Sequence, residues 1–331
     1  MNVFIARLYK ELARWFPIDI FTCGSKGTVR IGKNLQVIHH DHSLDDFADA
    51  VIKEHQSTPY SLIHTHYWLS GLIGMQIYKK LSIPWVHSYH TIEVFKQITR
   101  DKTRIEIETD ILKKCHYVLS PTRREAFDLA QIEPHTKVMT IPHGVETHTF
   151  KPSPNGHDSL LFVGRVDPIK GLEVLIDALG LVDRDVTLNV VGGAAKDRSA
   201  YVDLKSYGRN QQINFKGRVA HDRLVHHYST AGIVVIPSYY ESFGLVGLEA
   251  MASARPVIAF DDTGLVETVG NDAGILVSRN EKNLARAISY LIRNKERRYE
   301  LGLTGRKKAV KYDWRAIAAI YRKTYEAIAK T

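Results

Sequence analysis

The sequence predicts an α/β protein of two Rossmann-like domains, each a mostly parallel sheet covered by helices. Its 331 residues are a usual length for two domains. Short apolar runs at 233–236 and 257–260 are typical of buried parallel strands. Strand and helix patterns alternate over residues 18–145, and the alternation restarts after residue 156. The sequence therefore predicts two domains with a similar plan.

The first half is predicted to begin with an amphipathic helix over residues 1–16, whose apolar side contains Val3, Leu8, Leu12, Trp15 and Phe16. The elements expected next are a strand at 18–23, a hairpin over 27–40, a helix at 43–55 capped by Ser43, a strand at 61–66, a helix at 67–81, and strands at 83–90, 118–122 and 138–145. We assign residues 1–150 to this N-terminal domain.

The second half starts after turn-forming residues at 151–156, which mark the linker. Its expected elements are a strand at 160–166, a helix at 170–182, a strand at 186–193, a helix at 200–211, a strand at 213–219, a helix at 221–231, the stretch 233–260, a strand at 274–277 and a helix at 281–294. We assign residues 151–310 to this domain and residues 311–331 to a C-terminal helix.

Composition restricts the class of partner. The formal net charge of +9 attracts anions, among them nucleotide sugars, phosphorylated acceptors, anionic lipids and nucleic acid. No nucleic-acid-binding motif accompanies this charge, so nucleic acid ranks last. Two cysteines, Cys23 and Cys115, make no disulfide framework, and no signal-peptide pattern or bilayer-spanning apolar run is found. A cytoplasmic protein, with at most peripheral membrane contact, is expected.

Residues 233–260 predict a strand, a loop, a helix from Leu245 to about Ala254, and a second strand. The loop 241–244 reads Glu-Ser-Phe-Gly and opens the helix, where free N–H groups and the helix dipole favour a phosphate. Its glycine permits close approach because it has no Cβ. Arg165 and Lys170 follow another strand, and two cations there could neutralise a diphosphate leaving group.

The string ESFGLVGLEA resembles the E-x7-E signature of retaining, nucleotide-sugar-dependent glycosyltransferases of family 4, which have the two-domain GT-B fold with a cleft between the domains. The resemblance is densest from Gly164 to Ala259. It is nearest to the branch of inositol-phosphate N-acetylglucosaminyltransferases and sucrose-phosphate synthases. It implies transfer of a hexosyl group from a nucleoside diphosphate sugar, with UDP-sugar favoured, to an acceptor hydroxyl. The acceptor would be phosphorylated or lipid-linked, and no metal or other cofactor is required.

The resemblance also implies roles for individual residues. The catalytic set would be His90, Arg165, Lys170 and Glu241. Donor binding would involve Gly164, Gly193, Arg218, Val219, Ser242, Phe243, Gly244, Leu245, Val246 and Glu249. Acceptor binding would involve Tyr67, Thr91 and Arg104. Within these sets, His90 would contact the sugar, Glu249 the ribose, and Arg165 and Lys170 the departing diphosphate.

Three other interpretations stay open. The pairs His64/His66 and His87/His90 suggest a metal site, but they match no recognised structural zinc spacing and no cysteine pair supports them. In the family, a strand and a glycine-rich loop precede residues that resemble the start of this chain. We therefore expect either a true start upstream or a truncated relative, with new sheet edges beside the missing strand. A truncated relative would be a non-catalytic nucleotide-sugar-binding or partner-binding homologue, whereas an upstream strand and glycine-rich loop would argue against that interpretation. A nucleotide-sugar epimerase of the same fold is less favoured.

Overall fold

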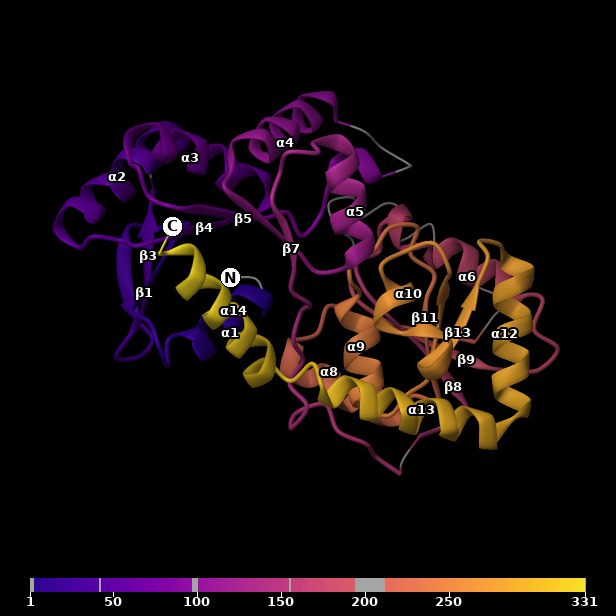
Figure 1. Ribbon diagram of the computed structural model, residues 1–331. Coiled ribbons are helices and arrows are strands. Elements are labelled where there is room, and N and C mark those ends of the chain that lie inside the picture. Colours follow the sequence, from indigo (N-terminus) through magenta and orange to yellow (C-terminus); the bar gives the residue numbers. More distant parts are fainter. Residues whose placement is uncertain (1–2, 42, 97–100, 155, 194–211, 331) are drawn as a thin grey trace. The chain divides into compact units, whose positions relative to one another are not determined.

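The computed structural model describes residues 3–41, 43–96, 101–154, 156–193 and 212–330 (Figure 1). The chain divides into two compact units, which are described separately. Unit 1 comprises Met1–Val94, Arg100–Gly144 and Trp314–Thr331, and unit 2 comprises Phe95–Thr99 and Val145–Asp313. Both are of the predicted α/β type. The helix expected at 200–211 lies outside the described residues.

Unit 1 begins with helix α1 (Val3–Leu12), which packs against the last helix, α14 (Trp314–Ile328). Figure 1 shows α14, in yellow, beside α1. One side of α1 is buried, at positions that share a helix face: Phe4, Leu8, Tyr9 and Leu12. Val3 is 37% exposed, so the prediction that it faces the core was wrong. The buried stripe instead runs through its neighbour Phe4, one position and about 100° further around the helix.

The strands of unit 1 form two sheets. They are β1 (Ile18–Cys23), β2 (Gly27–Arg30), β3 (Leu35–His40), β4 (Ile63–His66), β5 (Trp85–Ser88), β6 (Tyr117–Ser120) and β7 (Val138–Thr140). The strand orders are β1-β3-β2 and β4-β5-β6-β7. All pairings are parallel except β2 with β3, which is the predicted hairpin. Among the described strands, β1 and β4 therefore each lie at a sheet edge.

The remaining helices of unit 1 are α2 (Leu44–Ser57), α3 (Tyr67–Lys80), α4 (Lys102–Lys114) and α5 (Arg123–Ile132). α2 begins where the sequence predicts, because the Ser43 side chain accepts a hydrogen bond from the backbone N–H of Asp46 at 3.4 Å. α3 follows β4 directly and packs on α2 and α4. No described helix of the chain is both long and apolar enough to cross a membrane.

Unit 2 contains one parallel sheet of order β10-β9-β8-β11-β12-β13. Its strands are β8 (Ser159–Val163), β9 (Thr187–Val191), β10 (Ile213–Gly217), β11 (Ile233–Ile236), β12 (Val257–Phe260) and β13 (Gly274–Val277). Its helices are α6 (Leu172–Leu179), α8 (Leu224–Thr230), α9 (Leu245–Ala252), α10 (Leu265–Thr268), α11 (Gly270–Ala273), α12 (Glu281–Arg293) and α13 (Lys295–Val310), and its 3₁₀ turns are η2 (Pro168–Lys170) and η3 (His221–Arg223). A further 3₁₀ turn, η1 (Glu93–Phe95), follows β5.

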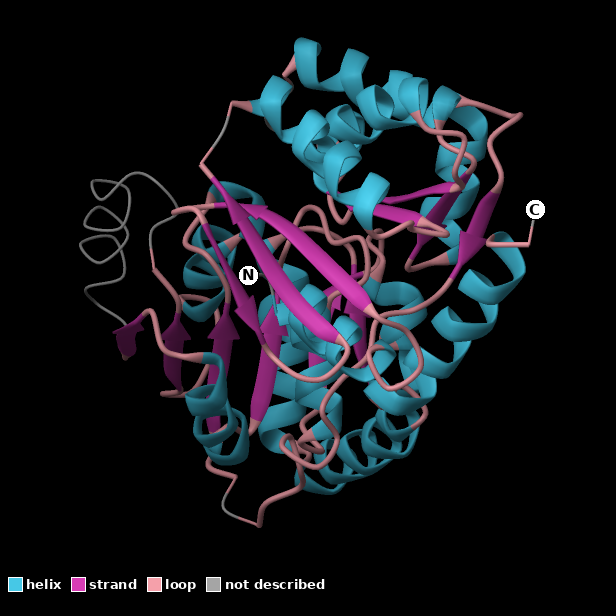
Figure 2. Ribbon diagram, turned by 90° about the vertical axis from the view of Figure 1, so that its left-hand side faces the viewer, coloured by secondary structure: helices cyan, strands magenta, loops and turns pink. Residues whose placement is uncertain are grey.

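Helices cover both faces of the sheet of unit 2. Alternate strand residues turn to opposite faces, so Ile233 and Val235 join α6 and α12 in one apolar cluster. Val234 and Ile236 join α8 and α9 in the other cluster. Strands β11 and β12 are buried along their whole length, as the continuous apolar runs predict. Figure 2 shows the strands of the structure in magenta and its helices in cyan.

Candidate functional site

The residues that follow four strands of unit 2 lie together at the carboxyl-terminal ends of those strands. We call this end of the sheet the carboxyl edge. Parallel strands share a direction, so Gly164 after β8, Gly192 after β9 and Arg218 after β10 lie at the same carboxyl edge. Backbone hydrogen bonds tie these ends together: Gly164 N–H donates to Val191 O at 3.0 Å, and Gly192 N–H donates to Gly217 O at 2.8 Å. The loop after β11 ends at the same edge and leads into α9.

The loop between β11 and α9 is held in one conformation. Gly244 has φ +86°, and a Cβ there would lie 2.2 Å from Leu265 Cδ2. Gly264 N–H donates to Glu241 O at 2.8 Å, and Thr268 Oγ1 donates to Phe243 O at 2.6 Å. The loop is thus fastened to α10, and the backbone of residues 243–246 opens helix α9 in a fixed orientation. Its amides are suited to an anion.

Lys170 and Glu241 meet at this loop, although they lie 71 positions apart. Lys170 Nζ is 2.5 Å from Glu241 Oε1, and Ser238 Oγ donates to the same carboxylate oxygen at 3.0 Å. The two side chains are only 21% and 17% exposed. Gly171 permits the approach because it has φ +68° and a Cβ there would lie 2.0 Å from Pro237 O. Two residues that were named separately as catalytic candidates therefore form an ion pair.

Glu249 lies inside α9 and is 8% exposed. It accepts hydrogen bonds from His221 Nε2 and from the Tyr228 hydroxyl, both at 2.8 Å. Burial, followed by the nearby Glu249 carboxylate, raises the pKa of Tyr228 well above its usual value, so the hydroxyl keeps its proton and donates. Phe150 packs edge-on against both partners of Glu249, at ring distances of 5.4 and 5.5 Å.

The other residues predicted to bind the donor lie near the carboxyl edge of the unit 2 sheet. Gly193 lies beside Arg218, since a Cβ at Gly193 would be 3.7 Å from Arg218 Cβ. Val219 packs on the cluster that contains α8 and α9. Arg165 has a side chain that is 61% exposed, and among the described residues its ion-pair partner is Asp167 at 3.7 Å. Within the described part of the chain, Arg165 therefore has a longer ion pair than Lys170 does.

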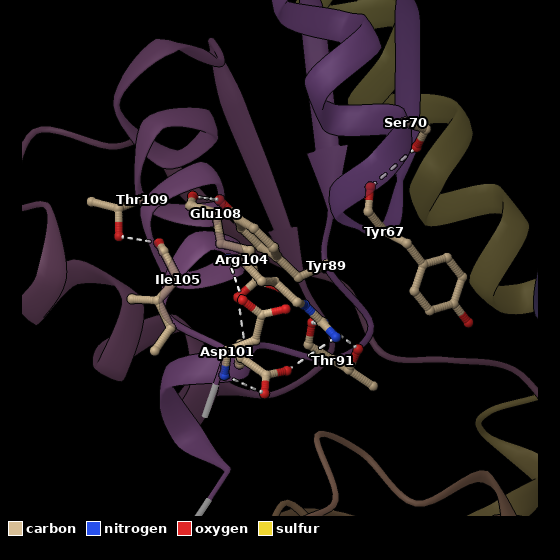
Figure 3. A network of polar contacts seen from close by, with 10 residues as sticks. Tyr67, Ser70, Tyr89, Thr91, Asp101, Arg104, Ile105, Glu108 and Thr109 are labelled. Carbon is tan, nitrogen blue, oxygen red and sulfur yellow. Dashed lines mark hydrogen bonds and ion pairs between the residues drawn. The ribbon is translucent and has the colours of Figure 1, made fainter. Parts of the chain in front are cut away.

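In unit 1, Arg104 joins Thr91 to two buried glutamates. Its guanidinium donates to Glu108 Oε1 at 2.7 Å, to Thr91 Oγ1 at 3.0 Å and to Thr91 O at 3.1 Å, and it lies 3.0 Å from Glu93 Oε2. Burial raises the pKa of Glu108, whereas its bonds to the Glu93 backbone and to Arg104 oppose that shift. Figure 3 shows Arg104 beside Thr91 and Glu108, with Tyr67 on a separate helix.

The histidines that end β4 and follow β5 form a compact group. His66 Nδ1 is 2.8 Å from His90 Nε2. The rings of Phe4 and Tyr67 each lie 4.7 Å from the His90 ring, and His90 has φ +60°. Burial lowers the pKa of His90 to about 4, so it is neutral near pH 7. Within the described ranges, no cluster of three or more His, Cys, Asp and Glu side chains could hold a metal ion.

Residues 1–149 match the family model described as Glycosyltransferase Family 4, and residues 146–308 match that of Glycosyl transferases group 1. The D-inositol 3-phosphate glycosyltransferase of Kineococcus radiotolerans is 30% identical to this chain over 390 residues, which cover 98% of this chain and 89% of that protein. The chain belongs to glycosyltransferase family 4. It is a nucleotide-sugar-dependent glycosyltransferase, as the sequence predicts.

Other relatives agree with this assignment. The Corynebacterium diphtheriae D-inositol 3-phosphate glycosyltransferase is 29% identical, over 98% of this chain and 89% of that protein. The sucrose-phosphate synthase of Thermosynechococcus elongatus superposes with a TM-score of 0.90 and 29% identity, over 98% of this chain and 94% of that chain. Anabaena HepE in complex with UDP-glucose has a TM-score of 0.77 and 20% identity, over 88% and 85% of the two chains, and shares the fold. The GT-B fold of the glycosyltransferase is therefore confirmed.

Two residues that contact a predicted donor-binding residue were not predicted from the sequence. His221 and Tyr228 both bond to Glu249, yet they precede it by 28 and 21 positions. His221 is one of sixteen histidines in the glycosyltransferase, and nothing local distinguishes it. An indirect signal pointed to them. A buried carboxylate needs hydrogen-bond donors, and the helix predicted at 221–231 directly precedes the strand that leads to Glu249, so its side chains were candidates.

Replacing Gly192 by alanine should destabilise the glycosyltransferase. Gly192 has φ +148°, and a Cβ there would lie 1.7 Å from Gly164 O, so the two strand ends must separate. We expect the free energy of unfolding to fall by about 2–4 kcal/mol, measured by urea denaturation.

Gly193→Ala is the matched control. Among the described residues, a Cβ at Gly193 meets its nearest atom at an ordinary 3.7 Å, so the unfolding free energy should change by less than about 1 kcal/mol. Equal stability of the two variants would contradict this account of the strand ends.

Proposed function

We propose that this glycosyltransferase moves a hexosyl group from UDP-hexose to a hydroxyl of a phosphorylated acceptor, with retention at the anomeric carbon. The observation that carries the proposal is the Lys170–Glu241 ion pair beside the fixed loop that opens α9. A cation, a carboxylate and oriented amides at one strand end are what a sugar diphosphate requires. No metal takes part in the proposed reaction.

The donor residues have distinct roles in this proposal. The backbone of residues 243–246, within the donor set Ser242, Phe243, Gly244, Leu245 and Val246, binds phosphate oxygens. Glu241 accepts from sugar hydroxyls, and Glu249 accepts from the ribose. Gly164 and Gly193 let the nucleotide approach the backbone, while Arg218 and Val219 border the base. Because Glu249 is already bonded to His221 and Tyr228, these two donors orient its carboxylate.

The proposed reaction exchanges one bond at the anomeric carbon. The acceptor hydroxyl oxygen bonds to that carbon on the same face from which the diphosphate leaves. The carbon–phosphate oxygen bond breaks, its electron pair stays on the diphosphate, and the hydroxyl proton passes to a leaving phosphate oxygen. Lys170 and Arg165 stabilise the growing negative charge, which lowers the barrier most where donors are preorganised. His90 contacts the transferred sugar.

In this proposal, the acceptor is bound by Tyr67, Thr91 and Arg104 of unit 1. The relatives from Kineococcus and Corynebacterium are named for D-inositol 3-phosphate, which supports a phosphorylated polyol or sugar as acceptor. The net charge of +9 also supports an anionic acceptor, whether free or lipid-linked at a membrane surface. We propose a cytoplasmic site of action.

Calorimetric titration of the 331-residue chain with UDP, GDP and ADP tests the donor site. We expect saturable binding of UDP. Lys170→Ala and Arg165→Ala should each weaken binding about tenfold to a hundredfold, because each removes a charged partner of the diphosphate. Arg286→Ala, an exposed arginine on α12, should leave the affinity unchanged. A folded chain that binds none of the three nucleotides would overturn the proposal.

A further inference from the structure

Arg279 follows β13 and contacts the segments that follow β11 and β12. Its Nη2 donates to the carbonyl oxygen of Tyr239, after β11, at 2.7 Å. Its Nε lies 2.8 Å from Oδ1 and 2.6 Å from Oδ2 of Asp262, after β12. The guanidinium carbon also lies 5.5 Å from the centre of the Tyr239 ring. Arg279 therefore joins the ends of three adjacent strands at the carboxyl edge of unit 2.

Tyr239 connects this contact to the turn that carries Lys170. The Tyr239 N–H donates to Ile169 O at 2.8 Å, and Ile169 precedes Lys170 in η2. The Tyr239 ring lies 5.8 Å from the Phe260 ring of β12 and packs on the apolar cluster that contains α6 and α12. The backbone of Tyr239 is thus held by η2 through its N–H and by Arg279 through its carbonyl. A shift of Tyr239 would therefore disturb the turn that places Lys170.

The loop that contains Tyr239 also carries Glu241, shortly after it in the sequence. Gly264 N–H donates to Glu241 O at 2.8 Å, and Gly264 belongs to the loop after β12 that begins with Asp261 and Asp262. The loops after β11 and β12 are therefore connected at two places. One connection runs through the Arg279 side chain, and the other is the direct backbone hydrogen bond. Together they fix the backbone from which the Glu241 side chain extends.

The charges of Arg279 and Asp262 suit such a connection. Their side chains are 19% and 38% exposed, and a guanidinium largely shielded from water needs a carboxylate beside it. Hydrogen bonds from a charged donor are also stronger than those between neutral groups, so the bond to Tyr239 O holds the loop firmly. An exposed ion pair such as Arg297–Glu300 on α13, with side chains 45% and 63% exposed, contributes much less.

We propose that Arg279 and Asp262 are positioning residues that set the separation and direction of the Lys170 ammonium and the Glu241 carboxylate. The inference rests on the proposed function, in which this ion pair serves the sugar diphosphate. Arg279 and Asp262 act through the backbone of Tyr239, which is bonded to the turn of Lys170 and lies in the loop of Glu241. The two charged groups are thereby oriented before a donor binds, as preorganised electrostatic stabilisation requires.

Amide hydrogen exchange of the full chain, followed by NMR without any substrate, tests the structural half of the proposal. Arg279→Lys keeps the positive charge but removes the planar fork that reaches Asp262 and Tyr239 O together. We expect the N–H groups of Tyr239 and Gly264 to exchange about tenfold to a hundredfold faster. Arg297→Lys, in the exposed pair on α13, is the control and should leave both rates unchanged. Unchanged rates in Arg279→Lys would overturn the proposal.

Steady-state kinetics separate a positioning role from a general loss of stability. Arg279→Lys should lower kcat about tenfold to a hundredfold, because a displaced Lys170 ammonium no longer meets the departing diphosphate in the right geometry. In the Glu241→Gln background the ion pair is already broken, so the same change should cost less than about threefold. A merely structural defect would cost the same in both backgrounds, and that result would overturn the proposal.

Asp262→Asn tests the other partner of the same contact. It should lower kcat in the same way, and the double variant with Arg279→Lys should be no slower than the slower single variant, because both changes break one connection. Losses that multiply in the double variant would contradict a shared role. A failure of the proposed function would be seen separately, as an unaltered chain that binds no UDP, and the exchange rates of Tyr239 and Gly264 would still decide whether Arg279 positions the loop.

Discussion

Glu241→Gln is expected to lower the transfer rate by about a hundredfold to a thousandfold, as the loss of a preorganised electrostatic contact does elsewhere. The glutamine amide keeps the shape of the carboxylate. Its oxygen can still accept the hydrogen bond that Ser238 Oγ donates to Glu241 Oε1, at 3.0 Å in the unchanged protein. It cannot neutralise Lys170, whose Nζ lies 2.5 Å from the carboxylate oxygen. The lysine is then free to turn, and the geometry offered to the departing diphosphate is lost. Steady-state kinetics with UDP-glucose as donor would measure the change.

The matched control is Glu296→Gln, which makes the same chemical change at an exposed position on α13. It should keep the rate within about twofold, since surface substitutions seldom matter. Thermal unfolding of both variants separates a catalytic defect from a folding defect. A Glu241→Gln enzyme with unchanged kcat and KM would show that the ion pair is not part of the donor site.

Lowering the pH from 7 to 5 is expected to remove several kcal/mol of the free energy of unfolding of unit 1. Burial lowers the pKa values of five histidines there: His64, His66, His87, His90 and His143. For His87 and His90 the values are about 3 and about 4. Unfolded histidines bind protons below about pH 6.5, while the native ones do not, so the unfolded state gains about 2 kcal/mol per histidine over this range.

Glu125 acts in the opposite direction. Burial raises its pKa to about 8, so the native carboxyl is protonated at pH 7 while the unfolded one is ionised. Its contribution to stability is fully present at low pH and is lost as pH rises toward 8. Acidification to pH 5 therefore returns about 2–3 kcal/mol through Glu125, which offsets between one and two of the histidines. The net effect stays destabilising.

Urea unfolding at a series of pH values measures this effect, and its slope with pH counts the protons taken up on unfolding. His66→Gln should reduce that count by about one near pH 5, whatever its effect on the stability itself. His135→Gln, an exposed histidine of unit 1, is the control. A stability that stays constant between pH 7 and 5 would be incompatible with five histidines that remain neutral in the folded protein.

Local patterns predicted the elements that position the site. The apolar runs of β11 and β12, with Gly244 between them, predicted a buried strand–loop–helix–strand unit, and the structure has it. The apolar run before Arg165 and Lys170 predicted a strand followed by two cations, and both residues follow β8. These predictions succeeded because period, turn residues and strand direction are properties of short segments.

Contacts between distant segments could not be predicted in this way. The partners of Glu249 depend on how α8 packs against the sheet, and the pairing of β1 with β3 rather than with β4 depends on the order of strands. The positive φ of Tyr67 and His90 was also unexpected, since neither is glycine. Such features arise from tertiary packing, which overrides local preference.

Unit 1 is built from segments that lie far apart in the sequence, and this affects the order in which the two units can fold during synthesis. Helix α14 places the Tyr325 hydroxyl against His64 Nδ1 and packs against α1, a helix from a much earlier part of the sequence. A nascent chain therefore lacks one wall of the histidine group until residues 314–328 have been synthesised. Unit 2, which is nearly continuous in sequence, can complete its sheet earlier. A chain that ends after Asp313 would contain all of unit 2 and a unit 1 that lacks α14.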